Sequence, residues 1–343
     1  MKIVFICTNY GLYKDGIGHY VYNLKKEMCK NKKCEIKIIS GDTTQKKGKE
    51  KFFSKIMYNS INEFLKNELN FIDKDTYFII EYPFLEWNPI IISSIKKLRK
   101  ICNLKNGKII LSIHEYKRVH KIRKKFIDLL IKLSDALMVT DYETKKILLN
   151  KNKPILIRGI PSNIQRINKP IKNKDNIFCF FGLVNKSKAF NEMIEAWKIF
   201  DEKDYKLNIY TSSDINILNS EKNKINIFKE LSDQELSKEL WKCKYAILPI
   251  KPQISMNNAT LKAVAQHECI PIGIFEDNNT SDLGINIEDE FYSKENILEA
   301  LKKTVNLEKD EYLRKINLLN KFSEKFSFKK NSNDILNFLE KVI

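Results

Sequence analysis

Residues 178–197 read FCFFGLVNKSKAFNEMIEAW and place two lysines, Lys186 and Lys188, in a short polar turn. The apolar run before the turn predicts a strand that ends at Gly182, and apolar residues recur with helical spacing from Phe190 to Trp197. The backbone amides at the start of a helix, together with a lysine, form a site for an anion. Lys188 is therefore a candidate for holding a phosphate, and the alternative is an ordinary surface charge.

A second turn with the same placement stands near the start of the chain. In GLYKDGIGHYVYNLKKEM, Gly16 and Gly18 fall between a first apolar run and a first helical pattern. Glycines at such a turn let the backbone approach a ligand closely. The spacing matches only part of GxGxxG, because Val21 stands in the last slot. A nicotinamide site is not favoured, and a bare tight turn is the structural alternative.

Other polar side chains follow strand-like runs in the first half. His114 comes directly after KIILSI, where a histidine is either catalytic or a structural hydrogen-bonding group. Glu81 and Trp87 lie in IIEYPFLEWNP, which follows another such run. They are candidates for shaping an acceptor pocket, and the alternative for Trp87 is packing of a loop.

A basic stretch, HEYKRVHKIRKKF, begins at His114 and has Glu115 and Arg118 near its start. This stretch is either a solvated helix face or an acceptor-side patch that contacts lipid phosphates. Each basic group near an anionic leaflet contributes about 1 kcal/mol. If the stretch is helical, it brings together Lys117, Lys121, Lys124 and Lys125.

The composition bounds the class of protein. A chain of 343 residues exceeds one ordinary core, so two domains are expected, and 43% hydrophobic residues can fill both. The net charge of +18 favours an anionic partner such as nucleic acid, a membrane leaflet or a nucleotide, or it reflects a generally solvated basic surface. No RNA- or DNA-binding pattern accompanies the charge, so nucleic acid is not favoured. Seven cysteines without CxxC spacing predict buried, reduced thiols.

Targeting and metal signals are absent from the sequence. The apolar stretch in MKIVFICTNY is short, which predicts a first strand rather than a signal peptide. No run approaches the roughly 18 apolar residues that span a bilayer, so any membrane contact is expected to be peripheral. HExxH and DxD are missing and the four histidines are scattered, so no metal site is expected.

Strand-like and helical patterns alternate along the chain, which predicts an α/β protein built from βαβ units with parallel sheets. The alternation restarts at NIFCFFG, after a lysine-rich connector that contains prolines. We expect an N-terminal domain over residues 1–165 and a second domain over 172–328. A closing helix over 329–343 is expected to pack back across the hinge. Open α/β sheets place ligands beyond the carboxyl ends of their strands, so the two domains are expected to face each other across a cleft.

The order of these motifs resembles that of GT-B glycosyltransferases. NYG…DGIGHYVYNL, SIHEY, IPSN, FGLVNKSKAFNEMIEAW and LSDQELSKELWKCKYAILPI followed by ATLKAVAQHECIPI span essentially the whole chain. The chain is most similar to the retaining GT4-type enzymes that bacteria use on cell-envelope polysaccharides. The resemblance implies two Rossmann-like domains, a UDP- or GDP-sugar as donor, and no cofactor or metal.

The resemblance also implies roles for individual residues. The glycine loop would lie against the donor diphosphate or the acceptor, His114 would face the reacting sugar, and Lys188 would grip the diphosphate. The acceptor side would take Glu81, Trp87, Glu115 and Arg118. The donor side would take Gly16, Gly18, Gly182, Asn185, Lys186 and the loop of Asn257, Asn258, Ala259 and Thr260.

The sequence departs from the family pattern in two places. Where the family has an Arg beside the Lys, this chain has Leu183 and Asn185, and Lys186 is a possible substitute. The family also carries two glutamates near the reacting sugar and the ribose. Here the matching positions hold Ile254 and Lys262, or Ser255 and Ala263 if the register slips by one.

These observations predict a metal-independent hexosyltransferase that is cytoplasmic and peripheral at the membrane. It would act on a lipid-linked cell-envelope glycan, such as capsule or O-antigen, beside other polysaccharide-assembly enzymes. Preorganised amides and a lysine aimed at the leaving diphosphate would supply most of the catalysis. Two rivals remain open. One is a nucleotide-sugar epimerase or hydrolase of the same fold, and the other is a non-catalytic accessory subunit.

Overall fold

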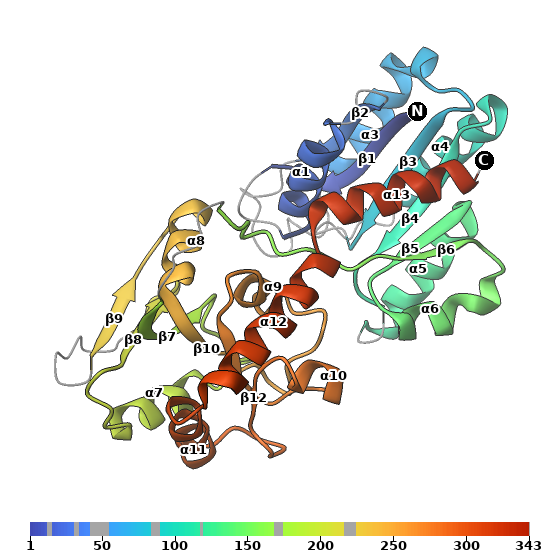
Figure 1. Cartoon of the computed structure of the whole chain (residues 1–343). Coiled ribbons are helices and arrows are strands. Elements are labelled where there is room, and N and C mark those ends of the chain that lie inside the picture. Colours follow the sequence, from blue (N-terminus) through green and yellow to red (C-terminus); the bar gives the residue numbers. More distant parts are fainter. Residues whose placement is uncertain are drawn as a thin grey trace. The chain divides into compact units, whose positions relative to one another are not determined.

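The computed structural model describes residues 1–11, 16–30, 34–41, 55–83, 90–116, 119–167, 174–215 and 224–342. The chain divides into two compact units (Figure 1). Unit 1 comprises Met1–Ile160 together with Phe328–Ile343, and unit 2 comprises Pro161–Ser327. The division falls after Ile160, whereas the sequence predicted a connector near residues 165–175. The closing helix belongs to unit 1.

Unit 1 is built on sheet A, in which six parallel strands lie in the order β2-β1-β3-β4-β5-β6. Its strands are β1 (Lys2–Thr8), β2 (Glu35–Gly41), β3 (Thr76–Tyr82), β4 (Lys108–Ile113), β5 (Ala136–Val139) and β6 (Ile155–Ile157). Its helices are α1 (Gly16–Met28), α3 (Ile56–Asn67), α4 (Ile91–Lys105), α5 (Lys121–Leu133), α6 (Tyr142–Leu148) and α13 (Phe328–Val342), with 3-10 turns η1 (Leu69–Phe71) and η2 (Leu149–Lys151).

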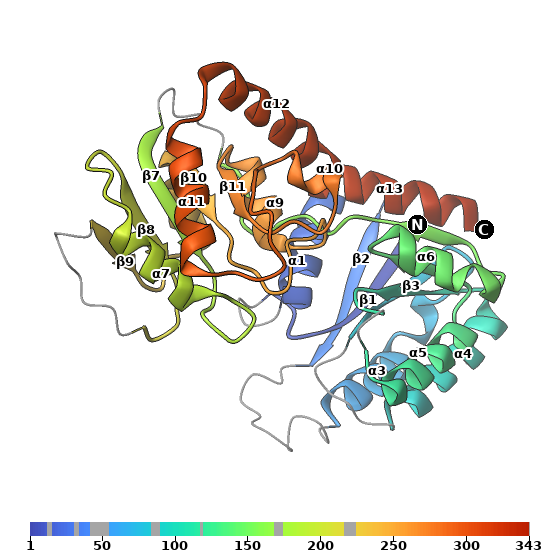
Figure 2. The same ribbon diagram turned by 90° about the horizontal axis from the view of Figure 1, so that it is seen from below.

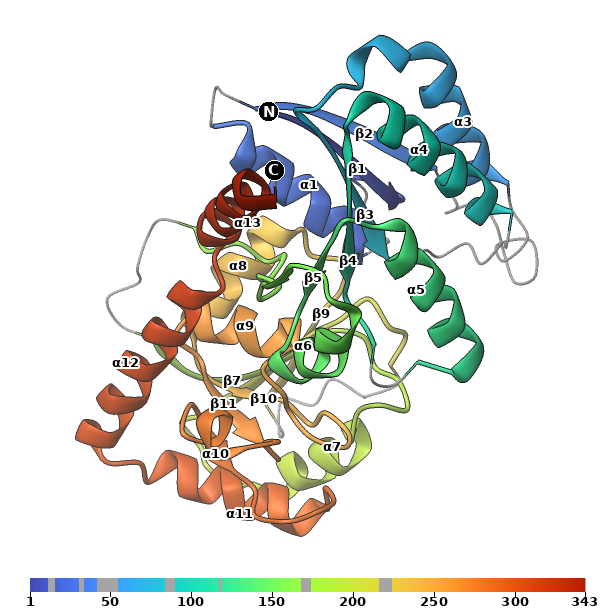
Figure 3. The ribbon, with the colours of Figure 1, turned by 90° about the vertical axis from the view of Figure 1, so that its right-hand side faces the viewer.

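Helices cover both faces of sheet A, which explains why its inner strands are apolar almost without interruption. Figures 2 and 3 show α1 and α13 on one face and α3, α4 and α5 on the other. Successive side chains of a strand point to opposite faces. In β3, Tyr77 and Ile79 therefore join the core beneath α1 and α13, whereas Phe78 and Ile80 join the core beneath α3, α4 and α5.

Unit 2 is built on sheet B, whose six parallel strands lie in the order β12-β11-β10-β7-β8-β9. Its strands are β7 (Asp175–Phe181), β8 (Lys206–Tyr210), β9 (Ile225–Phe228), β10 (Cys243–Ile247), β11 (Ile270–Gly273) and β12 (Ile285–Asn286). Its helices are α7 (Phe190–Ile199), α8 (Asp233–Lys242), α9 (Ala259–Gln266), α10 (Asn278–Ser281), α11 (Lys294–Val305) and α12 (Lys309–Lys325). Figure 3 shows α7 and α11 on one side of this sheet and α8 and α9 on the other.

Local sequence signals explain where several helices begin. A capping box begins α8: the Ser232 hydroxyl accepts a hydrogen bond from the Glu235 amide, and the Glu235 carboxylate accepts one from the Ser232 amide. Two donors that the helix leaves unpaired are thereby satisfied. Ser293 caps α11 through the same arrangement with Asn296. The starts of α8 and α11 are therefore each fixed by a few local residues.

The strand orders define one topological switch point in each sheet. In sheet A, β1 has its successor β2 on one side and β3 on the other. In sheet B, β7 has β8 on one side and β10 on the other, because the chain crosses back after β9. Open α/β sheets bind ligands beyond the carboxyl ends of the strands at such a point. The predicted α/β architecture with two parallel sheets is confirmed, and it locates two edges at which to look for a site.

Candidate functional site

The turn after β7 lies at the switch point of sheet B. Lys188 pairs as an isolated bridge with Ile250, which belongs to the loop after β10. The Ala189 amide donates to the Pro249 carbonyl oxygen at 2.8 Å. The Lys251 amide donates to the carbonyl oxygen of the residue before Lys188, also at 2.8 Å. The two strands that flank the switch point are thus joined at their carboxyl ends, with Lys188 between them.

The side chain of Lys188 has no compensating charge among the described residues. Its Nζ lies 5.8 Å from the centroid of the Phe180 ring, and no hydrogen bond or ion pair of this atom is present there. Burial lowers the pKa of Lys188 from its ordinary value. The neighbouring Lys251, by contrast, pairs with Glu192 at 3.0 Å. Lys188 is therefore a desolvated cation that lacks an anion.

The remaining predicted residues of this turn brace it. The Asn185 side-chain oxygen accepts hydrogen bonds from the amide and the hydroxyl of Ser187, at 3.0 and 2.6 Å. The Asn185 carbonyl accepts from the Lys188 amide at 3.0 Å. Gly182 has φ +114°, a backbone conformation that L side chains rarely adopt, and this positive φ turns the chain out of β7. Lys186 is exposed and could add to the positive field.

The predicted loop of residues 257–260 leads into α9. The Asn258 side chain accepts hydrogen bonds from the Ser255 amide at 2.6 Å and from the Ser255 hydroxyl at 3.3 Å, so it holds the loop. Asn257 and Ala259 are exposed, and Thr260 is half-buried at the start of the helix. Asn257 and Thr260 are the members of this loop whose side chains stay available for a ligand.

One helical turn further along α9, Lys262 occupies a position where the resemblance expects a glutamate. Its side chain is buried, and its Nζ has no hydrogen-bond partner among the described residues. The amine lies 4.6 Å from the centroid of the Phe326 ring. Burial lowers the pKa of Lys262 to about 7. The departure from the family pattern thus replaces a carboxylate with a buried amine.

At the carboxyl edge of sheet A, three polar side chains lie on one face of the sheet. Two of them, Glu81 and His114, were predicted as site residues, and the third is Ser112. Glu81 in β3 pairs in register with Ser112 in β4, and His114 follows Ser112 by two residues. The period of two puts all three on the face covered by α1 and α13. Glu81 is 1% exposed, so it continues the apolar row of Tyr77 and Ile79 with a buried charge.

These side chains converge on one carboxylate oxygen. Glu81 Oε2 accepts from the Ser112 hydroxyl at 2.5 Å and lies 2.6 Å from His114 Nε2. Arg158, directly after β6, donates through Nη2 to the same oxygen at 2.8 Å and also donates to the Ser112 hydroxyl. Burial lowers the pKa of Arg158 to about 9. A buried charge needs such pairing, because desolvation of a lone ion is costly.

Tyr20 of α1 covers this cluster. The Arg158 guanidinium lies 4.7 Å from the centroid of the Tyr20 ring, and the His114 ring meets the same ring edge to face at 5.5 Å. The sequence pattern indicated Glu81 and His114 as candidates, but not Arg158, Ser112 or Tyr20. A glutamate inside the apolar run FIIEY is expected to be buried, and a buried carboxylate needs a cation as its partner. This signal could have indicated an arginine at the end of a neighbouring strand.

The two glycines of the first turn have different surroundings. Both lie in the first turn of α1 rather than in a loop before it. A Cβ on Gly18 would lie 2.2 Å from the Asn9 carbonyl oxygen, so Gly18 is needed for close packing of the helix start on the end of β1. A Cβ on Gly16 would meet nothing within 4 Å, so close packing does not require a glycine at this position.

Two predicted acceptor-side residues, Trp87 and Arg118, lie outside the described residues. Glu115 is exposed. The helix expected in the basic stretch begins at Lys121 with His120 as its N-cap. Within the described parts of the chain, no helix is long and apolar enough to cross a membrane. The same residues hold no cluster of three or more His, Cys, Asp or Glu side chains that could bind a metal ion.

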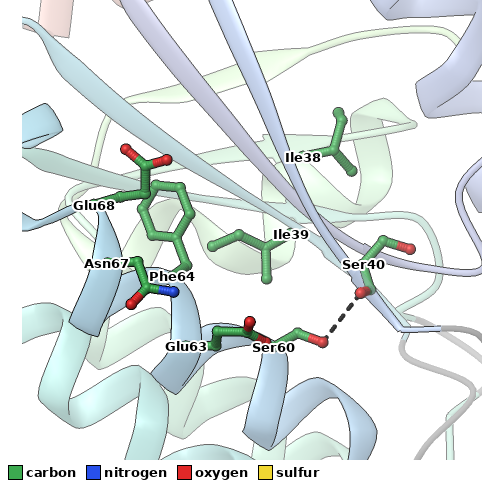
Figure 4. A pocket seen from close by; sticks show the side chains of 8 residues that line it. All are labelled: Ile38, Ile39, Ser40, Ser60, Glu63, Phe64, Asn67 and Glu68. Atoms are coloured by element: carbon green, nitrogen blue, oxygen red, sulfur yellow. Dashed lines mark hydrogen bonds between the residues drawn. The ribbon is translucent and has the colours of Figure 1, made fainter.

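A pocket of about 300 Å³ lies elsewhere in unit 1, between the edge strand β2 and α3 (Figure 4). There the Ser60 hydroxyl donates to the Ser40 carbonyl oxygen at 3.1 Å, and Glu63 and Glu68 line the wall. The strand β2 is separated from β4 by β1 and β3, so this acidic pocket is distinct from the His114 cluster.

The fold has relatives among solved structures, although no family model and no curated protein match the chain. An α,α-trehalose-phosphate synthase (UDP-forming) from Burkholderia xenovorans, in complex with glucose-6-phosphate, is 8% identical, with a TM-score of 0.66 over 98% of this chain and 99% of its own. A trehalose-6-phosphate synthase studied for glycosyltransfer with retention is 11% identical, with a TM-score of 0.63 over all of both chains.

A third similar structure is the pneumococcal O-GlcNAc transferase GtfA in complex with UDP and GlcNAc. It is 11% identical, with a TM-score of 0.58 over 82% of this chain and 60% of its own. At such identities the likeness shows the fold alone. The architecture is the GT-B fold, as the sequence predicted, and the identity of substrates and of catalytic residues needs its own argument.

Proposed function

We propose that this protein is a glycosyltransferase that moves a hexose from a UDP- or GDP-sugar to a glycan acceptor with retention of anomeric configuration. The observation that carries the proposal is Lys188, a desolvated cation without an anionic partner among the described residues, at the switch point of sheet B. A dianionic diphosphate supplies the missing charge. The three GT-B structures are described with sugar phosphates, a nucleotide or glycosyltransfer, which supports the same class of ligand.

The proposed chemistry needs charge stabilisation more than proton transfer. The bond from the anomeric carbon to the diphosphate oxygen breaks, and a bond from that carbon to an acceptor hydroxyl oxygen forms. The hydroxyl proton leaves with the nucleoside diphosphate, which carries both electrons of the broken bond. Lys188 and the turn amides would stabilise the charge that grows on the leaving oxygen. No step uses a metal or a cofactor.

The other predicted residues take supporting roles in this proposal. Asn257 and Thr260 would hydrogen-bond the donor, and His114 would face the reacting sugar. Gly16 would let a ligand approach the start of α1, with Lys186 adding to the field that attracts the diphosphate. The acceptor side would use Glu115, Arg118 and Trp87.

The acceptor is proposed to be a lipid-linked glycan of the cell envelope, met at the cytoplasmic face of the membrane. The net charge of +18 and the lysines of α5 support an anionic surface as the place of encounter. Other polysaccharide-assembly enzymes would be natural partners there. This part of the proposal rests on the family resemblance and on charge.

A second candidate function is a non-catalytic accessory subunit, and one observation favours it. Lys262 stands where a ribose-binding glutamate is expected, and a buried amine cannot accept a hydrogen bond from ribose when it is charged. Such a protein would keep the fold but would not bind a nucleotide-sugar donor. An epimerase of the same fold would need further acid and base groups beside the diphosphate, and no described residue of the Lys188 turn supplies one.

A panel of nucleotides in a thermal-shift assay tests the proposal. A ligand that binds only the folded state raises the melting temperature, so UDP or GDP should raise it and Lys188→Ala should abolish the rise. Lys251→Ala is the matched control, because Lys251 lies in the adjacent loop but is paired with Glu192. No response to any nucleoside diphosphate would overturn the donor assignment, and co-purification with an active transferase would then favour the accessory subunit.

A further inference from the structure

We propose that Glu81 and Arg158 are positioning residues for His114: they fix its Nε2–H and leave its Nδ1 to accept a hydrogen bond from a substrate hydroxyl. This inference rests on the proposed function, in which His114 faces the reacting sugar. It goes further by assigning a protonation pattern to the imidazole and a purpose to a buried ion pair.

The tautomer follows from the partner of each ring nitrogen. A carboxylate oxygen only accepts hydrogen bonds, and Glu81 Oε2 lies 2.6 Å from His114 Nε2, so this nitrogen must carry the hydrogen. Arg158 Nη2, also a donor, lies 3.3 Å from the same nitrogen and reaches past it to the carboxylate. In the neutral ring, the lone pair is therefore on Nδ1.

The outward nitrogen is available to a ligand. His114 Nδ1 makes no hydrogen bond with any described residue, and it is not among the buried polar atoms that lack a partner. The atom therefore reaches the surface, although the side chain as a whole is only 7% exposed. It does so at the carboxyl edge of sheet A, where a ligand is expected.

The ion pair with Arg158 explains how the Glu81 carboxylate can be buried beside His114. The guanidinium pairs with the carboxylate at 2.8 Å, so the buried charge of Glu81 has its own counterion. Among the described residues, the ring also contacts the Ser112 hydroxyl and the Tyr20 ring, and neither of these groups carries a charge. The His114 ring is thus held on one side by Glu81 and on the other by Tyr20.

The second buried histidine provides an internal reference. In unit 2, His267 Nδ1 lies 2.7 Å from the Ala263 carbonyl oxygen, which only accepts, so Nδ1 carries the hydrogen. Its Nε2 lies 2.7 Å from the Ser237 hydroxyl and accepts from it. His114 and His267 are therefore opposite tautomers in one molecule.

Nitrogen NMR of histidine-labelled protein tests the proposal without any substrate. The chain has only four histidines, so His114 and His267 can be assigned with His114→Asn and His267→Asn variants. We expect the Nε2–H form for His114 and the Nδ1–H form for His267 at neutral pH. In Glu81→Gln, the new amide can donate to Nε2, so His114 should change to the Nδ1–H form. The Nδ1–H form of His114 in the unaltered protein would overturn the proposal.

Kinetics with a nucleotide sugar form the second arm. Glu81→Gln should lower kcat at least about tenfold with the donor KM within about threefold, because the outward nitrogen becomes a donor. Arg158→Met should also lower kcat. Arg158→Lys should lower kcat less than Arg158→Met does, because lysine keeps the positive charge. An unchanged kcat in Glu81→Gln with the tautomer changed would also overturn the proposal.

The matched control is Asp135→Asn, which removes the carboxylate of another ion pair of the same sheet. Asp135 precedes β5 and pairs with Arg99 at 2.6 Å, at the amino edge of sheet A. This variant should keep kcat within about twofold and leave the His114 signals unchanged. If the unaltered protein shows the expected tautomers but transfers no sugar, the proposed function fails and the role of Glu81 in fixing the imidazole stands.

Discussion

At the carboxyl edge of sheet A, the guanidinium of Arg158 compensates the buried carboxylate of Glu81, and a hydroxyl and an imidazole complete the cluster. At the corresponding edge of sheet B, the ammonium of Lys188 has no acidic partner among the described residues. The buried amine of Lys262 in α9 also has no hydrogen-bond partner among the described residues. A buried ion pair can hold a neighbouring side chain in place, because its two charges compensate each other. A buried cation without a partner lowers the stability of the fold, and it is suited to bind an anionic ligand.

The largest expected effect comes from breaking the compensated cluster. Arg158→Leu leaves the Glu81 carboxylate buried without its cation, so it should lower the free energy of unfolding by about 3 to 5 kcal/mol. Urea unfolding followed by circular dichroism measures the loss. The double variant Arg158→Leu/Glu81→Leu should recover a good part of it, because no lone charge remains.

The control for this prediction is Arg99→Leu, which breaks an ion pair whose two side chains are 22% and 24% exposed. Solvent screens that pair, so the loss should be about 1 kcal/mol or less. Equal losses of unfolding free energy in Arg158→Leu and Arg99→Leu would show that the buried Glu81–Arg158 pair matters no more for stability than a partly exposed pair.

A smaller effect of opposite sign is expected at Lys262. Lys262→Met removes an unpaired buried amine and keeps most of its volume, so it should raise the free energy of unfolding at pH 7 by on the order of 2 kcal/mol. The folded-state pKa is about 7 against an ordinary 10.5, so the unfolded chain binds more protons between these values. The stability of the unaltered protein therefore rises with pH across this window, and the advantage of Lys262→Met should shrink toward pH 10.

Lys315→Met is the matched control for Lys262. The Lys315 amine donates to the Gly284 carbonyl oxygen at 2.7 Å and lies 3.3 Å from the Glu311 carboxylate, so its loss should destabilise the fold. Stabilisation by both substitutions would mean that pairing does not distinguish the two lysines.

The smallest stability effect is expected at Lys188. Burial lowers the pKa of Lys188, so Lys188→Met should raise the free energy of unfolding at pH 7, with the gain fading as pH approaches the ordinary value of 10.5. The gain should stay below about 1 kcal/mol, since the side chain is only partly buried and solvent screens its charge. Thermal unfolding at pH 7 and pH 9.5 measures it, and a clear loss of stability at pH 7 would show that Lys188 has a structural partner.

The sequence predicted the architecture because apolar runs, helical spacing and turn residues are local signals. The strand that ends just before Gly182, the turn with Lys188 and the capping box at Ser232 could all be recognised within a dozen residues. The pattern also placed His114 correctly at the end of a strand.

The partners of those residues could not be predicted in the same way. Glu81 and Arg158 are 77 residues apart, and only the strand order brings β3, β4 and the end of β6 to one edge. The helical pattern gave no warning that Lys262 would be buried, because a lysine on an amphipathic helix is usually exposed. Long-range register, rather than local propensity, decides which charges are compensated.

The most direct test of the account is calorimetric titration of UDP and GDP into the unaltered protein and into Lys188→Met. We expect the nucleotide that binds the unaltered protein to bind Lys188→Met at least about tenfold more weakly, a loss of about 1.4 kcal/mol. The parent nucleoside, which lacks the diphosphate, should bind both proteins equally. Equal affinity of both proteins for the nucleoside diphosphate would show that Lys188 does not hold a diphosphate.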